Sequence, residues 1–217
     1  MTQWMIHATA AFGLEAVVRR QCEALGFGPC QVEAGHVLFP GSLTTMQKAN
    51  LYLASADRVL LEVGRFPTES FESLFDAVAA MDWAEILPEN ARFPVRARTV
   101  KSKLASPSDV QKIVKKAIVT SLQKRYAIGH FPEDGALFPI DVTIRHDECV
   151  VCLDTTGEGL FKRGYRREKG GAPLKETLAA ALVDLSVWTP DRAFADVFCG
   201  SGTIVIEAAR KARGLSL

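Results

Sequence analysis

The spacing of apolar positions in the N-terminal part of the chain alternates between helical and strand periods. From Leu14 to Leu25 apolar residues recur every three or four positions, as on one face of a helix, and Gly26 follows as a stop signal. The pattern predicts a small α+β unit over 1–62. Its expected elements are a helix over 14–25, a strand at 37–39, a helix over about 44–56 and a strand over 58–66.

A second series of patterns, over 63–157, combines helices with a hairpin. Ser106 is placed as a helix N-cap, with Pro107 at the first helical position and Asp109 near the positive end of the helix dipole. We therefore expect a long helix here, with a buried stripe that begins at Val110. The other expected elements are a helix over 71–86 and a hairpin of strands over 140–145 and 150–153, joined by the polar turn 146–148.

The five cysteines are an odd number in a sequence long enough to fold without disulfide bonds, which favours a reducing compartment. Cys149 and Cys152 form a Cys-x-x-Cys pair, but no second pair completes a zinc site. Residues three apart on a strand point to opposite faces. We therefore expect these two side chains to have a core role, and the protein to hold no metal.

Composition predicts a folded chain with one large domain or two small ones. Of the 217 residues 48% are hydrophobic and 24% are charged, and the formal net charge is +1. There is enough apolar area for a core and no charge excess that would oppose collapse. No apolar run is long enough to span a bilayer and no signal-peptide pattern opens the sequence, so we expect a cytoplasmic protein with no membrane partner.

The near-neutral total hides a reversal of charge in the middle of the chain. Residues 67–90 contain six acidic and no basic residues, whereas 96–130 contain nine basic residues and one acid. At 100° per residue, the lysines of the helix that follows Ser106 lie opposite its apolar stripe, facing solvent or a partner. A nucleic acid is the partner that such a basic surface fits. The candidate contacts are Arg96, Arg98, Lys101, Lys103, Lys112, Lys115 and Lys116.

A second basic cluster, 161–171, is rich in glycine and poor in apolar residues, as is typical of a linker or a mobile loop. Its Arg163 and Arg166 are expected either to contact nucleic acid or to be plain linker charges. After it we expect a helix that starts at Pro173, a strand over 193–198 and a helix over 203–213. The apolar face expected for the first of these helices consists of Leu174, Leu178, Ala181, Leu182 and Leu185.

The segment 196–203 carries the motif with the clearest chemistry. A strand, a glycine turn and a helix N-terminus form the start of a nucleotide-binding unit, where small residues let the backbone approach a ligand. A dinucleotide fingerprint needs a third glycine where Val205 stands, and a P-loop needs a Gly-Lys-Ser/Thr sequence that is absent. An acid at the end of the strand suits the cationic ammonium group of S-adenosylmethionine (SAM). The expected SAM contacts are Asp196, Cys199, Gly200, Ser201, Gly202 and Thr203.

This segment resembles the THUMP-domain RNA methyltransferases, above all the bacterial enzymes that methylate guanine N2 of large-subunit ribosomal RNA. Val197 stands where the family usually has proline. The resemblance covers nearly the whole chain and implies SAM as cofactor and RNA, of ribosomal origin, as partner of the basic residues. It rests on the motif at 196–209, on the Ala-Pro-Leu-Lys-Glu-Thr-Leu sequence at 172–178, and on matches at 8–15, 96–125 and 161–166.

One motif of that family is missing. Its members carry an Asn/Asp-Pro-Pro-Tyr/Phe sequence that accepts hydrogen bonds from the target amine and stacks on the base, and no Pro-Pro occurs here. The acid expected on the SAM ribose, about 20 residues after the glycines, would lie beyond Leu217. We therefore expect no catalytic residue in the chain and no methyl transfer by residues 1–217 alone.

Taken together, the patterns and the resemblance imply an α+β fold followed by the first part of a Rossmann-like α/β domain. The favoured function is SAM-dependent methylation of guanine N2 in large-subunit ribosomal RNA. Adenine-N6 methylation of DNA and a non-catalytic RNA-binding fragment or adaptor stay open as alternatives. The expected domains are a ferredoxin-like unit (1–62), a THUMP domain (63–157), a basic connector (158–171) and the start of a methyltransferase domain (172–217).

Overall fold

The computed structural model describes residues 3–127, 131–166 and 173–217. The chain forms two compact units, the first joining 1–61 to 158–217 and the second consisting of 62–157. The described part of the expected connector, 158–166, and the segment expected to begin a methyltransferase domain therefore pack with the N-terminal residues. The remainder of the connector, 167–171, lies outside the described residues.

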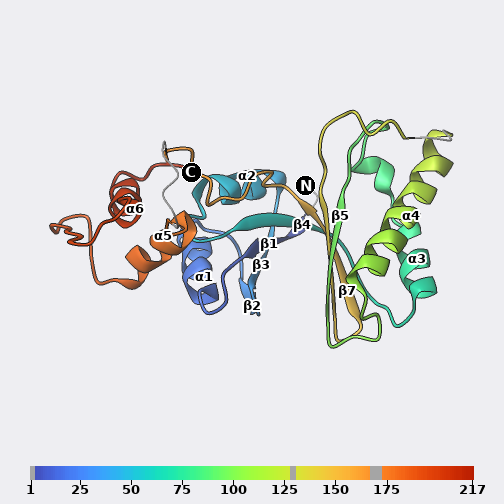
Figure 1. The fold of residues 1–217 in the computed structure, drawn as a ribbon, viewed down its shortest axis with the longest axis horizontal. Helices are drawn as coiled ribbons and strands as arrows, with labels where there is room; N and C mark the ends of the chain where they lie inside the picture. The colour runs from blue at the N-terminus through green and yellow to red at the C-terminus, as the bar shows by residue number, and fades with distance from the viewer. Residues whose placement is uncertain (1–2, 128–130, 167–172) are drawn as a thin grey trace. The chain divides into compact units, whose positions relative to one another are not determined.

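The N-terminal part of the first unit has the expected ferredoxin-like fold, with two strands, over 4–9 and 31–33, in addition to the elements that the periodicity predicts (Figure 1). Strand β1 lies between β3 and β4 and is antiparallel to both, with Ile6 opposite Phe39 on one side and Leu61 on the other. The strand order is β2-β3-β1-β4. The elements are β1 (Trp4–Thr9), α1 (Glu15–Ala24), β2 (Gln31–Glu33), β3 (His36–Gly41), α2 (Leu43–Tyr52) and β4 (Arg58–Pro67).

Local sequence explains most of these boundaries. Ser42 caps α2 through a capping box, since its hydroxyl accepts the Thr45 amide while the Thr45 hydroxyl accepts the Ser42 amide. The expected end of this helix near residue 56 was wrong, because Leu53 leaves helical geometry. Leu53 and Ala56 are both fully buried after the helix has ended, so their apolar character serves the core rather than a fourth helical turn.

The second unit packs two helices against one face of a sheet (Figure 1). Strands β5 and β6 are parallel and joined by α4, and β6 and β7 form an antiparallel hairpin. Side chains from the helices and from alternate strand positions fill its core. The elements are α3 (Phe71–Ala79), the 3₁₀ helix η1 (Trp83–Glu85), β5 (Val95–Val100), α4 (Pro107–Tyr126), β6 (Ile140–Arg145) and β7 (Glu148–Asp154).

The predicted cap and hairpin of this unit are confirmed. The Ser106 hydroxyl accepts the Asp109 amide, and Pro107 is the first residue of α4. His146 and Asp147 both have positive φ, 50° and 63°, as a two-residue type I′ turn requires. The single helix expected over 71–86 was wrong: the chain turns at residue 80 so that Trp83 is fully buried and donates its indole N–H to the Val78 carbonyl at 2.8 Å.

Cys149 and Cys152 are both buried on β7, as expected for core residues. Burial raises the pKa of the Cys149 thiol to about 12, so the thiolate that a metal needs is disfavoured. Across the described ranges, no group of three or more His, Cys, Asp or Glu side chains is placed to hold a metal ion. No described helix is both long enough and apolar enough to cross a bilayer.

The C-terminal part of the first unit contains α5 (Glu176–Leu185) and α6 (Thr203–Ala212). Helix α5 starts three residues after Pro173, and its expected apolar face was only partly right, because Ala181 is buried but two of the leucines are not. Leu182 and Leu185 are about half exposed, at 43% and 53%, because small side chains let α5 pack closely against its neighbours. The buried face consists of Ala179, Ala180, Ala181 and Val183.

The strand expected over 193–198 is also wrong. In the part of the chain that the structure describes, no strand pairs with this segment, which is irregular over 193–196 and in a turn at 197–198. Trp188 packs edge-to-face against Phe194 at 5.2 Å between ring centroids and donates its indole N–H to the Arg192 carbonyl. Strand geometry needs a hydrogen-bonded neighbour, so an apolar run without one takes another shape.

Candidate functional site

The glycine loop turns sharply into the start of α6. The Gly202 amide donates to the Cys199 carbonyl at 2.7 Å, which closes the turn. Gly200 and Gly202 have φ values of 54° and 72°, a region that side chains disfavour. No side chain caps α6, so its first amides face outward without intrahelical acceptors. These are the features of a backbone site for a polar ligand.

The acid of the motif lies at the entrance to this loop. The Asp196 carboxylate accepts the Phe198 amide at 3.1 Å, and its side chain is only partly buried. Val197 and Phe198 are 84% and 93% exposed, and Cys199 is exposed as well. The carboxylate is thus fixed by the backbone and still open to a cationic group.

A partly buried arginine, Arg166, forms hydrogen bonds to the end of the loop. Arg166 donates from Nη2 to Thr203 Oγ1 at 3.3 Å, and the Thr203 hydroxyl lies 3.0 Å from that of Ser201. The same guanidinium forms an ion pair with Glu176, at the first turn of α5, at 2.8 Å. The loop and the start of α5 are therefore tied to one side chain.

The second arginine of the expected connector is completely buried. Arg163 pairs with Glu207 of α6 at 3.4 Å, and Tyr165 donates its hydroxyl to the same carboxylate at 2.9 Å. Arg163 also donates to the carbonyls of Leu160 and Ala54. Burial lowers the pKa of the Arg163 guanidinium, against the opposing effect of Glu207, and burial also raises the pKa of Tyr165.

These contacts change the interpretation of Arg163 and Arg166. A guanidinium with 0% exposure, as at Arg163, has no free face for a phosphate, and Arg166 is only 19% exposed. Residues 163–166 are an ion-paired part of the first unit rather than a mobile loop. Sequence reasoning missed their partners, Glu176 and Glu207, which are 10 and 44 residues away. The Ile-Glu-Ala-Ala sequence in the motif was the available signal for Glu207.

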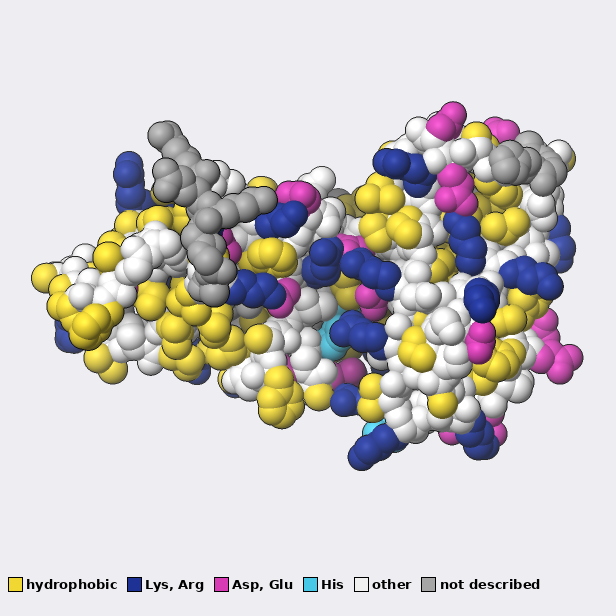
Figure 2. Space-filling view, viewed as in Figure 1, with side chains coloured by type: hydrophobic (Ala, Val, Ile, Leu, Met, Phe, Trp, Pro, Cys, Tyr) yellow, Lys and Arg dark blue, Asp and Glu magenta, His cyan; other side chains and the backbone are white. Residues whose placement is uncertain are grey.

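Most of the basic residues expected to contact RNA in the second unit have acidic partners. Figure 2 shows acidic side chains interspersed among the basic ones of this unit. All but one of the acids come from outside the basic window, so the charge asymmetry of the sequence is partly cancelled in space. The pairs are Arg96 with Asp154 (2.6 Å), Arg98 with Asp141 (3.5 Å), Lys103 with Glu69, Lys112 with Asp109 (3.4 Å) and Lys115 with Glu133 (2.5 Å).

The three lysines of α4 differ in exposure, contrary to the expectation that all face outward. Lys112 is 78% exposed, and Lys116 is exposed one turn later, with its ammonium 5.9 Å from the Phe75 ring. Lys115 folds over the Phe93 ring at 3.5 Å and donates to the Phe93 carbonyl. Lys101 is exposed, and no described carboxylate pairs with it or with Lys116.

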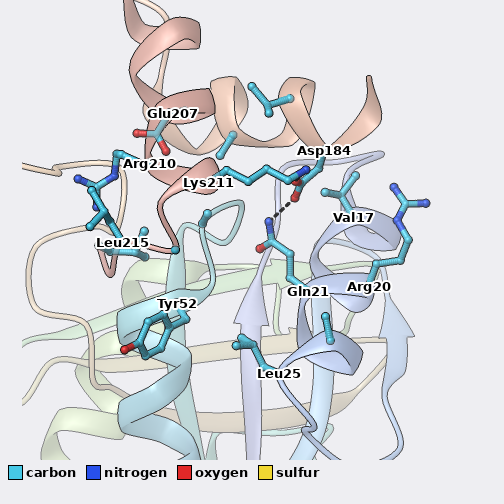
Figure 3. Close-up of a pocket in the computed structure, with 16 residues that line it drawn as sticks. Val17, Arg20, Gln21, Leu25, Tyr52, Asp184, Glu207, Arg210, Lys211 and Leu215 are labelled. Atoms are coloured by element: carbon cyan, nitrogen blue, oxygen red, sulfur yellow. Dashed lines mark hydrogen bonds and ion pairs between the residues drawn. The ribbon is translucent and has the colours of Figure 1, made fainter. Parts of the chain in front are cut away.

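The first unit contains a cavity of about 550 Å³ (Figure 3). It is bounded by α1, α5, α6 and the residues after α6. Its central polar groups satisfy one another, because Asp184 accepts from Gln21 at 2.5 Å and pairs with Lys211 at 2.7 Å. None of the expected site residues lines it.

Three family models match successive parts of the chain. They are the RlmL ferredoxin-like domain over 5–60, the THUMP domain over 68–154 and the RMKL-like methyltransferase domain over 163–215. The matches cover most of the sequence in the order that the fold shows. The chain therefore contains, in this order, an RlmL-type ferredoxin-like domain, a THUMP domain and the start of an RMKL-like methyltransferase domain.

One related protein and two related solved structures agree with these domain matches. YpsC of Bacillus subtilis is named as a candidate RNA methyltransferase. It is 48% identical over 211 residues, which make up 96% of this chain and 54% of that protein. A solved structure from Listeria monocytogenes, described as a predicted N6-adenine-specific DNA methylase, is 48% identical with a TM-score of 0.94 and covers 99% of this chain and 56% of its own. The structure of SMU.472, described as a candidate methyltransferase complexed with SAH, is 47% identical in sequence and has a TM-score of 0.92. The match covers 100% of this chain and 57% of that one. The chain thus spans about half the length of these relatives.

Proposed function

We propose that the protein is a SAM-dependent RNA methyltransferase of the cytoplasm, in which the second unit binds RNA and the glycine loop holds part of SAM. The observation that carries the proposal is the loop itself: two left-handed glycines and an uncapped helix start lie beside an accessible carboxylate. The SAH held by SMU.472, a relative with the same fold, supports the choice of cofactor. Guanine N2 of large-subunit ribosomal RNA is the target that the family resemblance favours.

The described residues suit the amino acid part of SAM. A positive φ at Gly200 and Gly202 lets the loop turn its amides toward a ligand, and the Asp196 carboxylate offers an acceptor for an ammonium group. When bound, SAM supplies a methyl group on a positively charged sulfur, which a nucleophilic base amine can attack in line. Since such a reaction depends chiefly on positioning, the role of residues 196–203 is to bind and orient. Residues 1–217 alone should transfer no methyl group, because they contain no Pro-Pro motif.

The exposed side of α4 is the best-supported RNA surface. Lys112 and Lys116 project from successive turns, and Lys101 lies on the segment before the helix. Phosphates are bound by such exposed ammonium groups, and each one neutralised releases counterions from the RNA. Arg96 and Arg98, paired with carboxylates but 47% and 63% exposed, remain available to a phosphate that competes for them.

The test is RNA binding over a salt series by wild type and by the double variant Lys112→Glu and Lys116→Glu. The double variant should bind structured RNA at least about tenfold more weakly and should show a shallower dependence on salt, because two phosphate contacts are lost. The free energy of unfolding should change little, since both side chains are exposed. The matched control, Lys162→Glu on the first unit, should bind like wild type. Equal affinity of the double variant and wild type at every salt concentration would contradict an RNA surface on α4.

A second candidate is adenine-N6 methylation of DNA, the activity named for the Listeria relative. Methyl transfer by the protein extended through the whole domain, compared on ribosomal RNA fragments and on duplex DNA, separates the two. Transfer to DNA alone would favour the second candidate, and SAM-independent RNA binding without transfer to either would favour an adaptor.

A further inference from the structure

We infer that Arg166 is a positioning residue for the SAM loop: its guanidinium fixes the Thr203 hydroxyl, at the end of the glycine loop, against Glu176 at the start of α5. The inference rests on the proposed function, since it concerns the same site. No expectation from sequence assigned Arg166 this role, because a glycine-rich basic segment is typical of a linker.

The geometry supports a clamp with two arms. One arm is Nη2, which donates to Thr203 Oγ1 at 3.3 Å and to the Leu174 carbonyl at 3.1 Å. The other is Nε, which donates to Glu176 Oε1 at 3.1 Å, an oxygen that also accepts from Nη2 at 2.8 Å. Thr203 and Glu176 are 3% and 8% exposed. The clamp is therefore shielded from water, where its hydrogen bonds are stronger than at a surface.

The loop needs such a clamp because little else holds it. Between Cys199 and Thr203, the loop's own contacts are the turn from the Gly202 amide to the Cys199 carbonyl, the pair of Ser201 and Thr203 hydroxyls and a long Cys199 Sγ contact. Beyond these, the Gly202 carbonyl accepts the Ile206 amide of α6 at 2.9 Å, and Arg166 donates to Thr203. Two glycines make this segment costly to order. A loop already held in its binding geometry loses less entropy when a ligand binds. Arg166 should therefore raise the affinity for SAM without contacting it.

Arginine and threonine both have a specific part in this arrangement. A lysine at 166 has a single ammonium group and cannot reproduce the planar fork that reaches Glu176 and Thr203 together. A valine at 203 keeps the shape of threonine but lacks the hydroxyl that accepts from Arg166. The two substitutions remove the same bond from opposite ends, so their effects on SAM affinity should not add.

The experiment measures SAM and SAH dissociation constants by calorimetry for the protein extended through the methyltransferase domain, as in the longer relatives. Arg166→Lys and Thr203→Val should each weaken binding about three- to tenfold, a range set by the loss of one buried hydrogen bond. The double variant should be no weaker than the weaker single variant. Thr203→Ser, which keeps the hydroxyl, should recover most of the affinity that Thr203→Val loses. The matched control is Lys162→Met, which removes an exposed pair with Glu158 on the same segment.

The possible outcomes are distinct. If wild type binds neither SAM nor SAH, the proposed function fails. If wild type binds and both variants bind equally well, Arg166 has no positioning role. Lower thermal stability with unchanged dissociation constants, or fully additive losses in the double variant, would also overturn the inference, because they would leave Arg166 with a role in folding alone.

Discussion

At the scale of single residues, the buried carboxylate of Glu207 shows how charge can serve folding rather than binding. Its side chain is 2% exposed and accepts from Arg163 and Tyr165, while Arg210 lies 5.9 Å from the Tyr165 ring. The Arg163 guanidinium is held by this carboxylate and by two backbone carbonyls. The three side chains attach the segment after β7 to α6.

Removing the negative charge of Glu207 should strongly destabilise the first unit. Glu207→Gln leaves the Arg163 guanidinium buried without a counter-ion, a change that costs about 3 to 5 kcal/mol in comparable pairs. The check is the free energy of opening of α6, measured by hydrogen exchange. Glu158→Gln is the matched control, since its pair with Lys162 is exposed and its removal should cost less than about 0.5 kcal/mol. A cost for Glu207→Gln no larger than that of the control would mean that the pair contributes little.

At the scale of elements, the connection from β1 to α1 is ordered by one side chain. The Glu15 carboxylate accepts the Gly13 amide at 2.8 Å and the Gly35 amide at 2.9 Å, which joins this loop to the β2–β3 turn. The hydrogen bond from Gly35 is the main reason that the pKa of Glu15 lies below its ordinary value. The lowered pKa means that the ionised form is favoured by folding.

This connection should make stability depend on pH. A carboxyl whose pKa is lowered in the folded protein stabilises it above the ordinary Glu pKa of about 4.3, and the stabilisation disappears as pH falls through the folded-state value. Glu15→Gln should therefore be less stable than wild type by about 1 kcal/mol near pH 7, and the difference should shrink below about pH 4. Urea unfolding at a series of pH values measures this difference in unfolding free energy. Glu23→Gln, on the exposed side of α1, is the control. A difference that stays constant down to about pH 3 would contradict the role of ionised Glu15.

Elements also show where local patterns failed. Helix α5 turns its alanines inward and leaves Leu182 and Leu185 half exposed, although leucine is the more apolar residue. Close approach of helices depends on side-chain size as well as on apolar character. The apolar segment 193–198 likewise lacks a strand neighbour among the described residues. In both cases the deciding contact lies outside the element itself.

At the scale of the whole molecule, the second unit has a hydrophobic core of its own. The large core of the second unit is built entirely from residues between Val63 and Leu153, with fully buried Trp83, Phe93 and Ile118 among them. A self-contained core of this kind is the mark of a domain that can fold alone.

The fragment 62–157 should therefore fold by itself. It should unfold cooperatively in urea, and Trp83, the tryptophan in this range, provides a fluorescence signal. Within the fragment, Ile118→Val should lower the unfolding free energy by about 0.5 to 1.5 kcal/mol, as in a close-packed core. Val100→Ala, at a position that is 40% exposed, is the control and should have a smaller effect. A broad transition that is insensitive to Ile118→Val would show that the unit depends on the rest of the chain.

The sequence by itself determined the features that depend on neighbouring residues. The helices and strands α1, β3, α2 and β4, the Ser106 cap, the turn at 146–147 and the glycine loop at 199–202 follow from periodicity, capping and backbone preferences within a few positions. Tertiary structure alone decided which charges are exposed, which face of α5 is buried and whether an apolar run becomes a strand. An ion pair such as Arg163 with Glu207 joins residues 44 apart. No local pattern specifies such a partner, because the energy of a charge or a strand edge depends on what the fold brings beside it.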